Sequence, residues 1–166
     1  MNKRIGIDFG KTIANIYTVT DDEDQEYPNC FTILNHIVNR YSPANVYIIS
    51  KARQENSKKI MSWLIDHDFF NRTNFLKKNI KFVEDCHEKR AWVDKLKINY
   101  FIDDNLKVVR AIYNAPSLDK IIWFQGKQEL LKEIPKPYRK KIQISFNWNS
   151  IYKTFSKPGG VTLNLF

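Results

Sequence analysis

Cysteine and histidine are scarce in this sequence of 166 residues. The two cysteines, Cys30 and Cys86, lie far apart and lack the C-x-x-C spacing that metal-binding and redox cysteines favour. The three histidines, His36, His67 and His87, show no metal-ligand spacing either. The sequence therefore predicts neither a disulfide framework nor a zinc site.

Long hydrophobic runs are also missing. The N-terminal residues 1–4 pass directly into a short apolar segment, and no stretch is long enough for a signal peptide or a membrane-spanning helix. We therefore expect a cytoplasmic protein without a membrane partner. Hydrophobic residues make up 43% of the chain, which suits one globular domain. We expect this domain to cover residues 1–156 and residues 157–166 to form a flexible tail.

Acidic residues are fewer than basic ones, 18 against 27, which gives a net charge of +9. A basic surface attracts polyanions, so nucleic acid is a candidate partner. The lysines are spread along the chain among many Asn and Ile, a bias that AT-rich codons also produce, so charge alone is weak support. The dense run at residues 132–141 is interpreted as a solvated connection.

Five short apolar runs, rich in β-branched and aromatic residues, predict strands. Most of them lack period-two alternation, which is typical of strands buried on both faces of a parallel sheet. Segments with helical spacing lie between them, and this alternation favours an α/β fold. The expected strands are residues 4–8, 45–50, 80–84, 100–103 and 120–124. The expected helices are residues 30–41, 53–67, 88–97 and 106–114, followed by a helix at 128–133, a sixth strand at 142–146 and a last helix near Asn149.

The carboxyl ends of parallel strands are where ligands bind in such sheets. Asp8 ends the first run, Ser50 ends the second, and Asp103 with Asp104 ends the fourth, while Lys89 follows the third. Asp8 could attack phosphorus, a Mg²⁺ ion held by carboxylates would reduce anionic repulsion, and the hydroxyl and ammonium groups would bind phosphoryl oxygens. The structural alternative is that these residues only cap helices and turns or face solvent.

These residues also carry a family resemblance. Residues 5–12 (IGIDFGKT), residues 47–51 (YIISK), Lys89 and residues 100–104 (YFIDD) resemble, in order, the four motifs of the haloacid-dehalogenase-like hydrolase superfamily. The similarity covers about residues 4–125. It implies a Rossmann-like parallel sheet of about five strands flanked by helices, and an aspartyl-phosphate formed on Asp8. It also implies a Mg²⁺ site and a phosphate site at the motif residues.

The site residues that the motifs suggest fall into three overlapping sets. The catalytic set is Asp8, Ser50 and Lys89. The substrate-binding set is Gly10, Lys11, Thr12, Ser50, Lys51 and Lys89. The metal set is Asp8, Asp103 and Asp104, together with Gly10 through its backbone carbonyl.

Gly10 departs from the family pattern. Hydrolytic members usually carry a second Asp at this position as general acid and base, and losing such a proton relay typically costs about 10²–10⁴-fold in rate. The metal site does not need this side chain. The alternative function is therefore a catalytically inactive domain that keeps its phosphate site for binding or regulation.

Two lysines, Lys89 and Lys95, precede the fourth strand. A helix that follows the third strand begins at the carboxyl edge of the sheet and runs away from it. Lys95 would lie about 9 Å further from that edge, at about 1.5 Å per residue. Lys89 is therefore the expected phosphate ligand.

No segment is long enough for a large cap domain of the kind that family members often carry. Only residues 13–28, with an acidic stretch at 21–24, and residues 68–79 are available. A site without a cap could accept a phosphorylated macromolecule as well as a phosphorylated small molecule. Alternatively, a partner subunit could supply the cover, in which case the protein would be an oligomer.

A third reading comes from another class. Residues 5–12 also resemble the first phosphate loop of the actin, sugar-kinase and heat-shock ATPase superfamily, in which a glycine at the position of Gly10 is usual. That fold needs two such domains and a second glycine-rich loop. It would leave Ser50, Asp103 and Asp104 unexplained.

Overall fold

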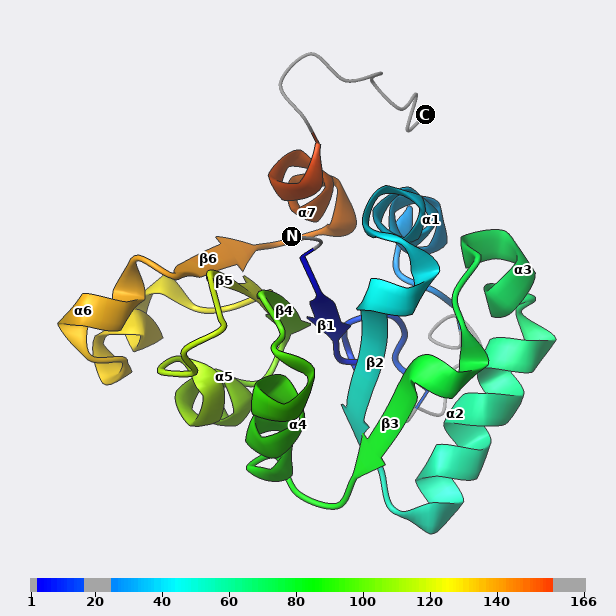
Figure 1. The fold of residues 1–166 in the computed structure, drawn as a ribbon, viewed down its shortest axis with the longest axis horizontal. Coiled ribbons are helices and arrows are strands. Elements are labelled where there is room, and N and C mark those ends of the chain that lie inside the picture. Colours follow the sequence, from blue (N-terminus) through cyan, green and yellow to red (C-terminus); the bar gives the residue numbers. More distant parts are fainter. Residues whose placement is uncertain (1–2, 17–24, 157–166) are drawn as a thin grey trace.

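The structure is a computed structural model that describes residues 3–16 and 25–156. In this part of the chain, six parallel strands form one sheet in the order β3-β2-β1-β4-β5-β6 (Figure 1). The strands are β1 (Ile5–Ile7), β2 (Val46–Lys51), β3 (Ile80–Val83), β4 (Tyr100–Asp103), β5 (Lys120–Phe124) and β6 (Ile142–Ser145). The expected α/β class is confirmed, and the sixth strand is present.

Helices follow the strands along the chain and cover both faces of the sheet (Figure 1). They are α1 (Cys30–Tyr41), α2 (Gln54–Asp66), α3 (Phe69–Thr73), α4 (Glu88–Leu96), α5 (Leu106–Ile112), α6 (Lys136–Arg139) and α7 (Trp148–Phe155). Three 3₁₀ turns complete the set: η2 (Pro43–Asn45), η3 (Lys77–Asn79) and η4 (Gln128–Glu133). The helix expected at 128–133 is thus a 3₁₀ segment.

The segments considered as a cover are small where they are described. Residues 68–79 form only α3 and η3, and two isolated bridges join Ala14 to Gly10 and to Glu26. No large cap domain is formed by the described residues. The acidic stretch at 21–24 and the tail expected at 157–166 lie outside the described residues.

No helix in the described part of the chain has the length and apolarity to cross a membrane.

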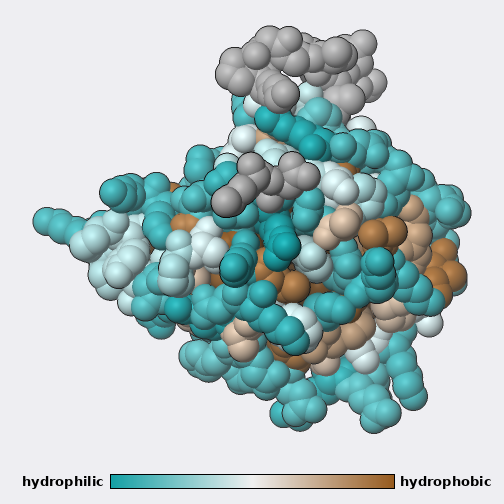
Figure 2. All heavy atoms as spheres, viewed as in Figure 1, coloured by the Kyte–Doolittle hydropathy of each residue, from teal (hydrophilic) through white to brown (hydrophobic). Residues whose placement is uncertain are grey.

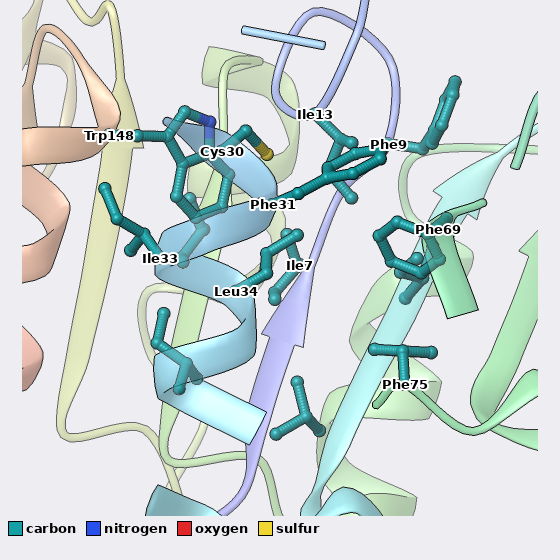
Figure 3. Close-up of a cluster of buried hydrophobic side chains, with 14 of the residues drawn as sticks. Ile7, Phe9, Ile13, Cys30, Phe31, Ile33, Leu34, Phe69, Phe75 and Trp148 are labelled. Carbon is teal, nitrogen blue, oxygen red and sulfur yellow. The ribbon is translucent and has the colours of Figure 1, made fainter. Parts of the chain in front are cut away.

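Two hydrophobic cores lie on opposite faces of the sheet. Ile121 and Trp123 of β5 pack into one core, whereas Ile122 and Phe124 pack into the other, because successive side chains of a strand point to opposite faces. Figure 3 shows part of the larger core, where side chains of α1 such as Leu34 lie between that helix and β1. Burial on both faces explains why the strands read as continuous apolar runs.

Gly6 in the middle of β1 allows the second core to close over the sheet. A Cβ atom at this position would lie 2.5 Å from Cδ2 of Phe101 on the neighbouring strand β4. Ile5 and Ile7 on either side face the larger core. The glycine is therefore required by the close approach of an aromatic ring.

Candidate active site

A hollow of about 250 Å³ opens at the carboxyl edge of the sheet. The loops after β1, β2, β3 and β4 meet there, since these four strands are neighbours in the sheet. The described residues that line it are Asp8, Gly10, Lys11, Ser50, Lys51, Cys86, Lys89, Asp103, Asp104, Asn105 and Val108. The site residues expected from the sequence are thus brought together in one place, with the exception of Thr12.

A buried ammonium group links two carboxylates at the base of the hollow. Nζ of Lys89 donates hydrogen bonds to Oδ1 of Asp8 at 2.6 Å and to Oδ2 of Asp103 at 2.7 Å. The side chains of Lys89, Asp8 and Asp103 are 2%, 8% and 0% exposed. Burial of this many charges is tolerated because each is paired. Lys95 lies elsewhere, with its Nζ 4.7 Å from the ring centroid of Trp92.

Strand register fixes the relative position of the two carboxylates. β1 and β4 are adjacent and parallel, with Ile7 opposite Ile102. The backbone N–H of Asp8 then donates to the carbonyl of Ile102 at 2.8 Å. Asp8 and Asp103 each come directly after one residue of the Ile7–Ile102 pair, so they lie side by side at the carboxyl edge of the sheet.

Three carboxylates could hold a metal ion. One oxygen from each of Asp8, Asp103 and Asp104 lies within 4.8 Å of the others. Oxygen ligands of this kind, supplemented by a backbone carbonyl and water, are those that Mg²⁺ prefers. The donor set present thus fits a hard divalent cation, and Gly10 lines the same hollow.

Asp103 and Asp104 have raised pKa values, mainly because burial disfavours the charged forms of these two carboxyl groups. Burial raises the pKa of Asp104 to about 6, and the nearby Asp8 carboxylate adds to the effect while Lys89 opposes it. Burial is also the main reason that the pKa of Asp103 is raised. For Lys89, burial lowers the pKa, but the charges of Asp103 and Asp8 outweigh it and raise the pKa above its ordinary value. Three clustered carboxyl groups thus share the single buried ammonium of Lys89, and a bound cation would favour their ionised forms.

Asn105 and Cys86 were not expected from the sequence. The backbone N–H of Asn105 donates to Oδ1 of Asp103 at 2.9 Å, and its side-chain oxygen accepts from the N–H of Lys107 at the start of α5. Its Nδ2 atom lies 3.8 Å from Sγ of Cys86. Asn105 therefore orients a carboxylate and caps a helix at once. An Asn directly before a helical segment is a recognisable cap signal, but its contact with the acid is not.

The remaining expected residues differ in exposure. Ser50 is buried, whereas Lys11 and Lys51 are exposed and line the mouth of the hollow. Thr12 is the exception, because it is fully buried and lies outside the lining of the hollow. Its hydroxyl has no hydrogen-bond partner among the described residues.

Two tryptophan side chains donate hydrogen bonds to the backbone of the loops that follow β1 and β4. Nε1 of Trp148 on α7 donates to the carbonyl of Thr12 at 2.9 Å. Nε1 of Trp123 on β5 donates to the carbonyl of Asp104, also at 2.9 Å. Each indole satisfies one backbone carbonyl of a loop that carries candidate ligands. These loops are therefore held by side chains distant in sequence.

Comparison with known proteins gives structural likeness alone. No family model matches the chain, and no curated protein matches it in sequence. The crystal structure of D,D-heptose 1.7-bisphosphate phosphatase from B. bronchiseptica, complexed with magnesium and phosphate, is similar with a TM-score of 0.61 and 10% identity, covering 92% of this chain and 97% of that one. A de novo designed Rossmann 3x3 fold protein is similar with a TM-score of 0.52 and 14% identity, covering 96% of each chain.

These likenesses establish the type of fold. The strand order and the covering helices are those of a Rossmann-like sheet. Because a designed protein shares the architecture, the architecture by itself carries no activity. Function has to be argued from the site.

Proposed function

We propose that the chain is a Mg²⁺-dependent phosphatase or phosphotransferase in which Asp8 is the nucleophile. The observation that carries the proposal is the cluster of Asp8, Asp103 and Asp104 at the carboxyl edge, with buried Lys89 and Ser50 in the same hollow. The similar phosphatase, complexed with magnesium and phosphate, supports it.

Mg²⁺ would be held by Asp8, Asp103 and Asp104, with the carbonyl of Gly10 as a further ligand. When bound, it would supply positive charge that offsets repulsion between the carboxylate nucleophile and the phosphoryl oxygens. Lys89 would add a fixed positive charge from the base of the hollow.

The chemistry proceeds in two displacements. An oxygen of Asp8 forms a bond to phosphorus while the bond from phosphorus to the ester oxygen breaks, which gives an aspartyl-phosphate and the released alcohol. Lys89 and Ser50 would bind the phosphoryl oxygens. Water, or an acceptor alcohol, then attacks phosphorus while the bond from phosphorus to the Asp8 oxygen breaks. The attacking oxygen gives its proton to solvent, phosphate or a new phosphate ester leaves, and the Asp8 carboxylate is restored. The leaving oxygen takes its proton from solvent, because Gly10 has no side chain to supply one.

Gly10 is the observation that favours a second candidate function, a phosphate-binding or regulatory domain without turnover. Such a protein would keep the carboxylates and Lys89 but lack a proton relay. The interpretation as an actin-like or sugar-kinase-like phosphate loop accounts for neither Ser50 nor Asp103 and Asp104 at the end of β4, which line the same hollow.

The two functions are separated by turnover. Purified protein with Mg²⁺ and a panel of phosphate esters should release phosphate, and Asp8→Asn should abolish that release. Activity unchanged in Asp8→Asn would refute the proposal. Gly10→Asp should raise the rate, by up to about 10²-fold if a proton relay is the missing part.

Binding is tested without turnover. Mg²⁺ together with beryllofluoride, a phosphate mimic, should raise the Tm of the protein, because any ligand of the native state stabilises it. A Tm shift with no activity in wild type or Gly10→Asp would select the binding domain. If Mg²⁺ and beryllofluoride at millimolar concentration cause no shift in Tm, the result would count against both candidate functions.

A further inference from the structure

Basic side chains gather at the amino edge of the sheet, opposite the candidate active site. Lys3 precedes β1, Lys97 precedes β4, Lys120 begins β5, and α6 and the residues after it precede β6. Arg40 lies in the last turn of α1. We call the following group the basic edge: Lys3, Arg40, Lys97, Lys120, Lys140 and Lys141.

Backbone hydrogen bonds place these positions side by side. The N–H of Asn99 donates to the carbonyl of Arg4 at 2.8 Å. The N–H of Lys120 donates to the carbonyl of Asn99 at 3.2 Å. The N–H of Ile121 donates to the carbonyl of Lys141 at 2.8 Å. With adjacent strands about 4.8 Å apart, the row from β1 to β6 spans about 15 Å. This width covers several phosphates of one nucleic-acid strand.

Most of the positive charge at the basic edge is not neutralised. Asp119 binds Lys3, with Nζ and Oδ2 2.7 Å apart, but both side chains are nearly half exposed. No described acidic group forms an ion pair with Lys97, Lys140 or Lys141. Lys97 and Lys140 are exposed. In Figure 2 the end of the molecule that carries α6 in Figure 1 is mostly hydrophilic or neutral in colour.

Aromatic rings lie among these charges. Tyr41 and Tyr100 are half-buried, with ring centroids 6.5 Å apart, and the guanidinium of Arg40 lies 5.4 Å from the ring of Tyr41. Tyr100 is paired in register with Lys120 on the next strand. Both rings also pack edge to face against Phe155, which fixes their positions. Basic side chains beside aromatic rings are typical of single-strand binding, in which bases stack on rings and basic groups follow the backbone.

A membrane surface fits this face less well. Peripheral membrane binding combines basic residues with apolar side chains that enter the lipid. The exposed large hydrophobic residues of the described part are Ile65 and Phe146, and neither belongs to the basic edge. Phe146 follows β6 and so lies towards the opposite edge.

We propose that the basic edge binds single-stranded nucleic acid, with Lys97, Lys140 and Lys141 on phosphates and Tyr41 or Tyr100 under a base. This inference is independent of the proposed phosphoryl transfer, because none of these residues lines the active-site hollow. Asp8→Asn should therefore bind nucleic acid as wild type does.

The test is fluorescence anisotropy with labelled single strands of about 12 nucleotides, within the usual range of site sizes. The variant Lys97→Gln/Lys140→Gln/Lys141→Gln should bind at least about tenfold more weakly at low salt. Its log–log salt slope should be shallower by about 2, since each phosphate contact on a single strand contributes about 0.7. The matched control is Lys58→Gln/Lys59→Gln/Lys127→Gln, which removes the same charge from exposed positions elsewhere and should change affinity less than about twofold.

The aromatic part is tested separately. Tyr41→Leu should weaken binding about fivefold or more, whereas Tyr41→Phe keeps the ring and should bind as wild type does. Equal Tm values would show that each variant is folded. Four results would overturn the proposal: no binding at low salt, equal loss in the control variant, tighter binding to duplex than to single strands, or lysine-dependent binding to phosphatidylserine vesicles in place of nucleic acid.

Discussion

Nζ of Lys89 lies 2.6 Å from Oδ1 of Asp8, and both side chains are buried. Removal of the ammonium would leave the carboxylates of Asp8 and Asp103 without their buried positive partner. A buried charge that loses its partner typically costs about 3–5 kcal/mol.

Lys89→Met should therefore lower the free energy of unfolding by about 3 kcal/mol at neutral pH without metal, measured by urea denaturation. Mg²⁺ should recover part of the loss, because it supplies the missing positive charge. Lys95→Met, at an exposed position on the same helix, should change stability by less than about 0.5 kcal/mol. Equal losses for both lysines would contradict the role assigned to the buried contacts.

The pKa of Asp104, raised to about 6, predicts a pH dependence with a definite sign. A carboxyl group whose folded pKa lies above its unfolded value holds its proton more tightly in the native state. It thus stabilises the fold at low pH and loses that contribution as pH rises through about 6. Between pH 4 and pH 7, the Tm of metal-free wild type should fall relative to that of Asp104→Asn. A constant difference between the two would contradict the shift.

Metal binding should show the complementary dependence. Mg²⁺ binds ionised carboxylates, so its binding to this site releases protons. The rise in Tm caused by Mg²⁺ should be larger at pH 8 than at pH 5, and it should shrink at both pH values in Asp104→Asn. Calorimetry in buffers of different ionisation enthalpy would count the released protons. An Mg²⁺ effect that does not change with pH would argue that the cation binds elsewhere.

The indole of Trp123 is expected to support the site from a distance. Trp123→Phe keeps a ring but removes the donor to the carbonyl of Asp104, and an unsatisfied backbone group costs about 1–3 kcal/mol. Stability should fall by that amount, and the Tm shift produced by Mg²⁺ with beryllofluoride should also diminish. Trp92→Phe on α4 is the control, since this ring lies against Lys95 outside the hollow. Lost stability with an unchanged ligand shift would limit Trp123 to a structural role.

Gly6→Ala should destabilise the fold through a clash with Phe101. Overpacking of a close-packed core costs about 1–3 kcal/mol. Phe101→Leu should relieve part of the clash, so that the double variant is less destabilised than the sum of the two single variants, as a double-mutant cycle would measure. Strict additivity would show that the two residues do not interact.

The sequence was sufficient for the class of fold. Strands buried on both faces show continuous apolar runs, and these runs predicted five strands. The sixth strand was expected separately at residues 142–146, and each expected bound lies within one residue of the observed one. Local signals of this kind depend on burial and backbone preference alone. The helix expected at 128–133 was predicted less well, since a short segment gives little information to separate α from 3₁₀ geometry.

The candidate site was predictable only as far as strand ends allow. Asp8, Ser50 and Asp103 lie at or next to the carboxyl ends of neighbouring strands, so topology brings them together. Thr12 belongs to the same sequence motif as Asp8 but is buried outside the hollow. Its backbone carbonyl accepts a hydrogen bond from the indole of Trp148, which lies 136 residues away in the chain. The contact between Asn105 and Asp103 depends equally on tertiary geometry. Such long-range contacts leave no periodic trace in a sequence.

The pairing of β1 with β4 has a consequence for the folding of the chain. Ile7 lies opposite Ile102, so the two acids that follow them meet on one side of the sheet edge. A slip of one residue would move Asp103 by about 3.3 Å and turn its side chain to the other face. The proposed cation site would then be lost although the sheet remained. If the proposed site binds a divalent ion, its affinity would report the correct alignment of two strands that lie 95 residues apart in the chain, as the pairing of Ile5 with Tyr100 illustrates.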